Sequence, residues 1–172
     1  MYVVSGEDHP RELSSLPQSS IGAPCPMLIA DEHSLRIAFY LEEDRLTSEW
    51  ACATALSPSV GDSDDLCAVV KFSMVYAHMF GPPNDEAFSS HPLASRGLSP
   101  YAAFEVVHSS WLRSLEKMNQ IHPYHRPERF SRYKHFILSF HDTTFECLAE
   151  SFDVSLRRGS VGRVLSIAAN ED

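Results

Sequence analysis

Apolar and polar residues alternate over several short segments of the chain, which is typical of strands that bury one face. The first predicted strand spans residues 34–41, and its apolar positions fall on one side: Leu35, Ile37, Phe39 and Leu41. A second strand is predicted over 49–56, where Ser57 and Pro58 end it. The regular part of the chain therefore begins with short strands.

A longer apolar stretch, residues 66–80, is also predicted to be extended, because its second half alternates. Five side chains are expected to share one face there: Phe72, Met74, Tyr76, His78 and Phe80. Pro82 and Pro83 end this strand. Residues 81–100 are predicted to form an irregular loop, and a loop of that length is often functional.

The next segment predicts a strand followed by two helices. Residues 101–107 read as the strand, and Ser109 or Ser110 can cap the first helix. One helical face should carry Trp111, Leu115, Met118 and His122, with Pro123 ending the helix. Pro127 can open a shorter helix that reaches about Tyr133.

The clearest pattern is a β-hairpin over residues 134–150. Phe136, Leu138 and Phe140 lie on one face of its first strand, and the second strand matches them with Phe145, Cys147 and Ala149. A turn centred on Asp142 and Thr143 would pair Phe140 with Phe145 and Leu138 with Cys147. Glu146 lies on the opposite face, so it is expected to be solvated or to face a cleft.

These elements predict an α+β fold: a mostly antiparallel curved sheet or small barrel of about six strands, with the helix pair inserted before the C-terminal hairpin. We expect residues 1–24 to form an extended or loose arm and residues 25–156 a single globular domain. Residues 157–172 are expected to be a loosely attached tail.

The composition is typical of a globular protein, and charge is unevenly distributed along the chain. The 172 residues are 44% hydrophobic and 22% charged, with a formal net charge of −9. Residues 1–65 hold twelve acidic and three basic side chains, which argues against a nucleic-acid or anionic-membrane binder. The exception is the stretch from Arg113 to Lys134, with six basic and two acidic residues. Its Arg126, Arg129 and Arg132 are candidates for binding a phosphate or an acidic partner, and the acidic partner could be the first third of the same chain or of a second copy. The simpler interpretation is a solvated helix face.

Cysteine spacing and the N-terminal sequence predict a cytoplasmic protein. Cys25, Cys52, Cys67 and Cys147 show no zinc or redox spacing, and the last three lie in apolar runs. The first residues do not resemble a signal peptide, and no apolar run approaches membrane-spanning length.

No standard catalytic or phosphate-binding motif is present, so candidate chemistry rests on clusters. The main cluster combines imidazoles, carboxylates and a guanidinium around the long loop: His78, Asn84, Asp85, Glu86, His91 and Arg96. Such groups could bind a metal or a small ligand, or act as acid and base. They could equally cap turns and pair locally. His78, on an apolar face, should meet a partner such as His91 in a common cavity.

Two further segments are weaker candidates. His141 lies at the predicted hairpin tip beside Asp142, but neighbours on a strand point apart, so a turn is the simpler interpretation. Arg157-Arg158-Gly-Ser-Val is similar to a basophilic kinase site, a match that arises easily by chance.

Three segments, Tyr76–Phe88, His91–Leu98 and Phe140–Cys147, resemble a group of small bacterial proteins of unassigned function. The resemblance covers residues 21–152 and implies no activity, cofactor or catalytic residue.

The sequence leaves two functional classes open. The first is a non-catalytic binding or protein-interaction module, which fits the missing motifs and the separated charge. The second is a small enzyme or metal-binding protein that uses the cluster around residues 78–97. The sequence identifies no cofactor, metal or ligand.

Overall fold

The computed structural model describes residues 2–47, 50 and 58–171. Contacts divide the chain into two compact units. Unit 1 comprises residues 1–13 and 75–151, and unit 2 comprises 14–74 and 152–172. Each unit has an antiparallel sheet, so the fold is α+β as predicted, and neither sheet closes into a barrel within the described residues.

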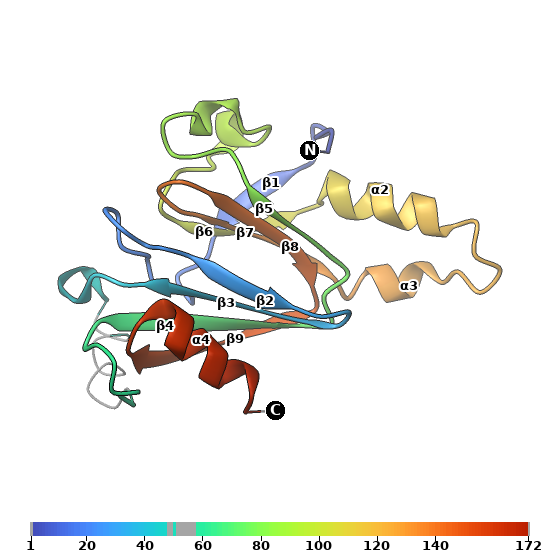
Figure 1. The fold of residues 1–172 in the computed structure, drawn as a ribbon. Coiled ribbons are helices and arrows are strands. Elements are labelled where there is room, and N and C mark those ends of the chain that lie inside the picture. Colours follow the sequence, from blue (N-terminus) through green and yellow to red (C-terminus); the bar gives the residue numbers. More distant parts are fainter. Residues whose placement is uncertain (1, 48–49, 51–57, 172) are drawn as a thin grey trace. The chain divides into compact units, whose positions relative to one another are not determined.

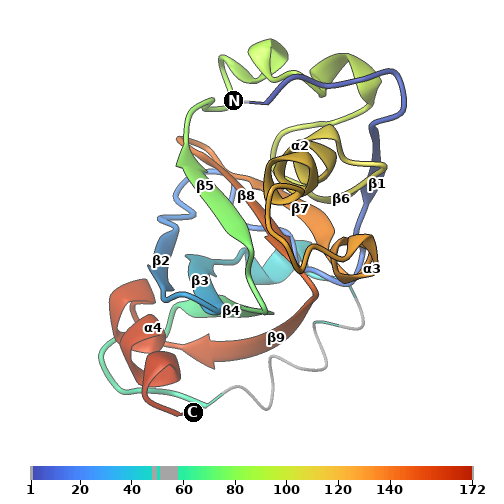
Figure 2. The ribbon, with the colours of Figure 1, turned by 90° about the vertical axis from the view of Figure 1, so that its right-hand side faces the viewer.

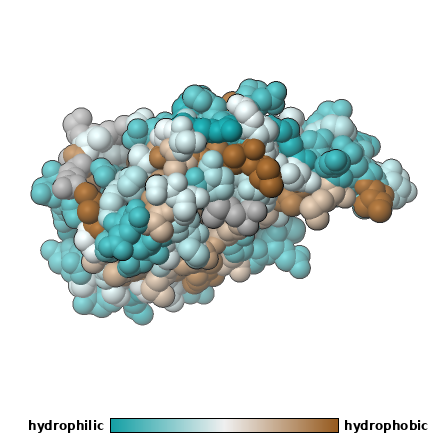
Figure 3. All heavy atoms as spheres, turned by 90° about the horizontal axis from the view of Figure 1, so that it is seen from above, coloured by the Kyte–Doolittle hydropathy of each residue, from teal (hydrophilic) through white to brown (hydrophobic). Residues whose placement is uncertain are grey.

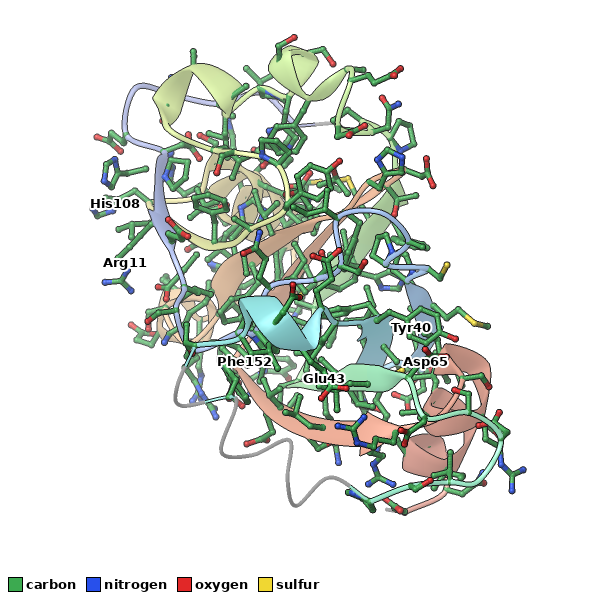
Figure 4. The ribbon with its side chains drawn as sticks, turned by 90° about the vertical axis from the view of Figure 1, so that its left-hand side faces the viewer. Arg11, Tyr40, Glu43, Asp65, His108 and Phe152 are labelled. Carbon is green, nitrogen blue, oxygen red and sulfur yellow. The ribbon has the colours of Figure 1, made fainter. Side chains whose placement is uncertain are left out.

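The sheet of unit 1 has five strands in the order β1, β6, β7, β8, β5, with every neighbouring pair antiparallel (Figure 1). The bounds are β1 (His9–Glu12), β5 (Ala77–Gly81), β6 (Ala103–Val107), β7 (Lys134–Ser139) and β8 (Thr144–Ala149). The outermost strand, β1, carries Arg11, which pairs with Glu105 of β6 at 3.0 Å (Figure 4).

The predicted hairpin is present as β7 and β8, but its register differs by two residues. Phe145 pairs with Leu138, and Cys147 pairs with Phe136. Phe140 belongs to the turn instead, where its N–H donates to the carbonyl of Thr143 at 2.8 Å. A shift of two keeps every side chain on its face, so the expected apolar face survives the error.

The stretch 66–80 is not one strand. It forms β4 (Leu66–Ser73) and β5, and between them Met74 adopts a φ of 54°. A left-handed residue redirects an extended chain, so the five predicted side chains do not share one face, although Tyr76, His78 and Phe80 are all exposed. Phe72 is fully buried in unit 2, whereas His78 and Phe80 of β5 are exposed.

The long loop before β6 has structure of its own. It contains two short 3₁₀ turns, Phe88–Ser90 and Ala94–Arg96, and it buries three apolar side chains against β6 and β7. These are Phe88, Leu93 and Leu98. Burying such a side chain contributes about 1.5–3 kcal/mol, which holds the loop on one face of the sheet.

The two predicted helices follow β6 as α2 (Ser110–Asn119) and α3 (Pro127–Phe130), and they lie beside each other in Figure 2. Ser109 caps α2 by accepting from the N–H of Leu112, as expected. Of the predicted helical face only the first residue is buried. Trp111 is 8% exposed, whereas Met118 is 71% exposed.

Unit 2 has four strands in the order β2, β3, β4, β9, and β3 (Ser34–Tyr40) corresponds to the first predicted strand. The others are β2 (Met27–Ala30) and β9 (Ser151–Arg158). Apart from Trp50, the strand predicted over 49–56 lies outside the described residues. Glu43, labelled in Figure 4, accepts two hydrogen bonds of 2.8 Å from Arg158.

Both chain ends are more ordered than the arm and tail expected from the sequence. Residues 1–24 contribute β1 and bury Leu16 and Ser19. In place of a loose tail over 157–172, the chain completes β9 and forms α4 (Val161–Ala169). Four side chains of α4 pack on β3 and β4: Val161, Val164, Leu165 and Ala168.

Candidate functional site

A buried carboxylate lies at the centre of the unit 1 sheet. Glu146 is on β8, opposite Ile137 of β7 and Met79 of β5. Only 3% of its surface is exposed, because the 88–98 loop and the N-terminal segment cover that face. Of the two alternatives expected for Glu146, solvated or facing a cleft, the first was therefore wrong. A charge in such a place needs hydrogen-bond donors around it.

Three side chains supply those donors. The Nε2 of His91 lies 3.2 Å from Oε1 of Glu146, and the Nε2 of His135 lies 2.9 Å from Oε2. The Tyr2 hydroxyl donates to Oε2 at 2.8 Å. Tyr2 also stacks on Trp111, with ring centroids 5.5 Å apart. The carboxylate is thus bound from the 88–98 loop, from β7 and from the N-terminal segment.

Hydrogen bonds to the other ring nitrogens assign the tautomers of both histidines. The Nδ1 of His91 accepts from the N–H of Leu93 at 3.1 Å, so the ring proton is on Nε2. The Nδ1 of His135 lies 2.9 Å from the Ser109 hydroxyl, which can donate to it, while the ionised carboxylate at its Nε2 can only accept. Both imidazoles therefore point N–H groups, not lone pairs, at Glu146. Among the described residues no group of three or more His, Cys, Asp or Glu side chains can hold a metal ion.

These contacts determine the ionisation of the network. Burial alone would raise the pKa of Glu146, but hydrogen bonds from His135, His91 and Tyr2 outweigh it and lower the pKa to about 2. Burial and the adjacent carboxylate raise the pKa of the Tyr2 phenol. Glu146 is therefore an anion and Tyr2 a neutral donor at neutral pH, and the network stabilises the fold around it.

A second buried carboxylate fastens the N-terminal segment to α2. Asp8 accepts from the backbone N–H groups of Ser110 and Ser5, and Arg96 donates to the carbonyl oxygens of Asp8 and Ser5. Burial opposes ionisation of Asp8, but the hydrogen bonds from Ser110 prevail and lower its pKa. Arg96 is thus engaged with the backbone of this segment.

A half-buried polar cluster lies at the turn between β7 and β8. The Nδ1 of His141 lies 3.0 Å from Oδ2 of Asp85 and 3.1 Å from the hydroxyl of Tyr101. Tyr101 also donates to the same Asp85 oxygen. The backbone supports this meeting, because the N–H of Asp85 donates to the carbonyl of His141 at 2.9 Å. We call these three residues the Asp85 cluster.

The hydrogen bonds of the Asp85 cluster stabilise the ionised carboxylate of Asp85. The hydrogen bond from Tyr101 lowers the pKa of Asp85, and the contact with His141 adds to this. The same hydrogen bond raises the pKa of Tyr101 to about 12. Asp85 therefore holds the His141 proton on Nδ1, which leaves the lone pair on Nε2. That nitrogen has no hydrogen-bond partner in the described part of the chain, and the His141 side chain is 41% exposed.

The structure separates most of the residues that the sequence grouped. Asp85 and His141 do meet, but His91 lies in the Glu146 network, and His78 is exposed on β5. The expected common cavity of His78 and His91 does not form, because β5 turns its alternate side chains outward. Two other members of the predicted cluster are Asn84, which accepts a local hydrogen bond from the N–H of Ala87, and Glu86, which is exposed.

Four residues that matter here were absent from the sequence-based site: Tyr2, Tyr101, His135 and Glu146. His135 and Glu146 carried a usable signal, because each interrupts an apolar strand of the hairpin on the same face. Tyr101 carried none, since its left-handed φ of 59° is a property of the folded loop.

The helical hairpin of α2, α3 and their connecting loop is a different kind of surface. Three large apolar side chains near the loop face solvent: Met118 is 71% exposed, Ile121 92% and Tyr124 78%. Figure 3 shows apolar side chains at the end of the molecule where this loop lies. His125 orders the loop through a 3.0 Å contact between its Nδ1 and Oδ1 of Asn119.

Basic side chains surround these apolar residues. Arg126, Arg129 and Lys117 are exposed and form no ion pair within the described residues. Arg132 differs, because it donates to Glu150 at 2.7 Å. The three arginines proposed from the sequence are thus exposed, and two of them are uncompensated.

A groove of about 560 Å³ runs between the N-terminal segment and α2. Its charged lining residues are Glu7, Arg113 and Lys117, and Arg113 is compensated by Asp8, which lies 3.7 Å away outside the lining, so that one acidic and one basic side chain remain. Such a lining gives no preference for an anion or a cation.

Two further groups considered from the sequence are the thiols of Cys67 and Cys147, which are buried, and the kinase-like motif, whose arginines form ion pairs. Burial raises the pKa of the Cys67 thiol to about 12 and that of Cys147 well above its usual value. Arg157 and Arg158, the basic residues of the kinase-like motif, are paired with Glu171 and Glu43.

Comparisons with protein-family models, with curated proteins and with solved structures found no significant match to this chain. The resemblance stated from the sequence stays a prediction. None of the helices in the described part of the chain combines the length and apolar character needed to span a bilayer.

Proposed function

We propose that this protein is a non-catalytic protein-interaction module whose contact surface is the α2–α3 hairpin. The observation that carries the proposal is the exposure of Met118, Ile121 and Tyr124 at one end of a helical projection. Large apolar side chains that gather on a surface are typical of binding sites. Covering one of them contributes about 1.5–3 kcal/mol, so three can anchor a partner.

The charge around the apolar residues supports an acidic partner. Six basic and two acidic residues lie between Arg113 and Lys134, in a chain whose net charge is −9. Exposed cations steer an oppositely charged partner to the surface and select against basic ones. An acidic segment with interspersed apolar side chains satisfies both features of the hairpin.

The polar groups elsewhere in unit 1 favour the same proposal. Glu146, His91 and His135 saturate one another inside the protein, and Arg96 binds backbone carbonyls. Groups used in this way stabilise a scaffold, and a rigid scaffold is what a projecting contact surface requires.

Selection from a random 16-residue peptide display library tests the proposal. We expect the wild-type protein to enrich peptides rich in Asp and Glu with interspersed Leu, Ile, Phe or Trp. Ile121→Asp should weaken binding of the enriched peptides at least tenfold, because it removes an apolar contact and adds a repelling charge.

His78→Asp is the matched control, because it adds the same charge at an exposed position on β5, outside the hairpin. Equal loss with both variants, or no acidic enrichment, would contradict the proposal. So would binding to phosphatidylserine vesicles without any peptide selection, since the hairpin would then be a lipid-binding element.

A second candidate function is a small enzyme, and the Asp85 cluster favours it. Asp85 fixes the tautomer of His141 and presents Nε2 to solvent, which is the arrangement of a general base or nucleophile. Tyr101, with its raised pKa, would act as a neutral hydrogen-bond donor beside it.

Hydrolysis of p-nitrophenyl acetate measures such an imidazole directly. If the cluster is catalytic, His141→Ala should reduce hydrolysis to background, and Asp85→Asn should reduce it about tenfold or more. His78→Ala, which removes another exposed imidazole, should leave the rate unchanged. Equal rates for the His78 and His141 variants would dismiss the enzyme hypothesis.

A further inference from the structure

Unit 2 carries an exposed surface whose character is opposite to that of the hairpin. Its edge strand β2 exposes Met27 by 49% and Ile29 by 43%. The turn that follows holds Asp31 and Glu32, both exposed. We call these four residues the β2 patch. The hairpin is apolar and basic, whereas the β2 patch is apolar and acidic.

The acidic character of the β2 patch is built into the turn. Asp31 accepts from the backbone N–H groups of His33 and Ser34 at 2.7 and 2.8 Å. Glu32 has no ion-pair partner in the part of the chain that the structure describes. Unit 2 as a whole is acidic, with twelve acidic and six basic side chains, so it adds to the negative electrostatic potential around the β2 patch.

We infer that the partner of the hairpin is a second copy of this chain, docked through its β2 patch. The inference rests on the proposed function, because it names the occupant of the same surface. Met27 and Ile29 supply the apolar contact for Met118, Ile121 and Tyr124, and the carboxylates of the turn face Arg126 and Arg129.

Each copy offers two different surfaces, so two copies can associate through one hairpin–patch contact or through two reciprocal contacts about a two-fold axis. A single contact leaves one hairpin and one patch free to bind further copies, whereas two reciprocal contacts stop at a dimer. In both cases the wild-type protein should associate in a concentration-dependent way.

Salt distinguishes the local attraction from the net charge of the chain. At about 0.1 M salt the Debye length is about 10 Å, so the net repulsion between copies is screened while contacting charges still attract. At about 1 M it falls to about 3 Å, and association should weaken.

Sedimentation velocity of two complementary variants tests the inference. Ile121→Asp/Arg129→Glu disables the hairpin and leaves the patch, whereas Ile29→Asp/Glu32→Lys disables the patch and leaves the hairpin. Each variant alone should be a monomer. An equimolar mixture should form a one-to-one dimer and nothing larger, because only one intact pair of surfaces remains. Glu32→Lys alone changes a fully surface residue and should still weaken self-association about tenfold.

Wild-type oligomers, monomeric single variants and a dimeric mixture would together support the inference. A wild-type protein that stays monomeric up to about 1 mM, or a mixture that stays monomeric, overturns it. If acidic peptides still require Ile121 in that case, the hairpin is an interaction surface for a different protein. If they do not, the proposed function fails as well.

Discussion

Two regions of unit 1 place side chains in an environment that is unusual for their type: polar groups in the interior in one, and apolar groups at the surface in the other. In the Glu146 network, a carboxylate and two imidazoles are buried, and the half-buried phenol of Tyr2 donates to the carboxylate. At the end of the α2–α3 hairpin, Met118, Ile121 and Tyr124 are 71%, 92% and 78% exposed. The polar groups inside hydrogen-bond to one another, whereas the apolar side chains outside remain mostly in contact with water.

The difference shows which of the two anomalies points to function. A buried polar group with every hydrogen bond made is explained by the fold itself. An exposed apolar cluster has no such internal explanation, because the fold gains nothing from it. Disrupting the first should therefore change stability, and disrupting the second should change binding alone.

Glu146→Gln should cause the largest loss of stability. The amide presents an NH₂ group to at least one of the three donors that surround it, and buried N–H groups are left unpaired. We expect the free energy of unfolding to fall by about 3–5 kcal/mol in urea titrations. Glu150→Gln, at the exposed pair with Arg132, is the control and should cost about 0–1 kcal/mol. Similar losses in both variants would mean that the buried Glu146 network contributes no more to stability than the Arg132–Glu150 ion pair.

Acid should weaken the same network over a defined range. The pKa of Glu146 falls from an ordinary 4.5 to about 2 in the folded protein, so its contribution is complete above about pH 4.5 and is lost as the pH falls toward 2. That contribution is on the order of 3 kcal/mol. The stability difference between wild type and Glu146→Gln should shrink accordingly. A difference that stays constant from pH 7 to pH 3 would show that Glu146 is not ionised.

Tyr2→Phe should have a smaller effect, because it removes one donor and keeps the ring. A hydrogen bond to a charged acceptor contributes about 1.5–3 kcal/mol, and Tyr2 donates to Glu146 at 2.8 Å. Tyr124→Phe, at an exposed phenol of the hairpin loop, is the matched control. Urea titrations should separate the two, and equal midpoints would mean that the Tyr2 hydroxyl contributes nothing.

Ile121→Asp should change stability least. The side chain is 92% exposed, so its replacement should alter the free energy of unfolding by no more than about 0.5 kcal/mol. The same substitution is expected to weaken peptide binding at least tenfold. A clear drop in thermal midpoint would mean that Ile121 belongs to the core, and the contrast between the two regions would vanish.

Local patterns predicted the fold where neighbours in the sequence are neighbours in space. The alternation of residues 34–41 became β3, the hairpin became β7 and β8, and Ser109 caps α2. The hairpin register was wrong by two, because alternation fixes faces and not turn length. Helix α4 was missed although Ser160 precedes an apolar repeat at i, i+3, i+4 and i+7. The break at Met74 left no mark in the sequence.

The candidate site was predictable only in part, because its members come from distant segments. Asp85 and His141 were named, but nothing in the sequence indicates that they touch across 56 residues. The partner of His91 is 55 residues away on β8. Residue type indicated which side chains could do chemistry, and tertiary structure decided that most of them are used internally.

The hydrogen bond between Tyr2 and Glu146 also has a consequence during synthesis. The two residues are 144 positions apart, and β1 pairs with β6 residues that lie 92 to 98 positions further along the chain. A ribosome that adds about 5–20 residues per second leaves the N-terminal segment without its partners for roughly 7–30 s. Throughout that interval the nascent segment must remain soluble by itself, and its charged residues Glu7, Asp8, Arg11 and Glu12 suit that task. Residues 2–12 are therefore placed only after residues more than 90 positions further along the chain have been made.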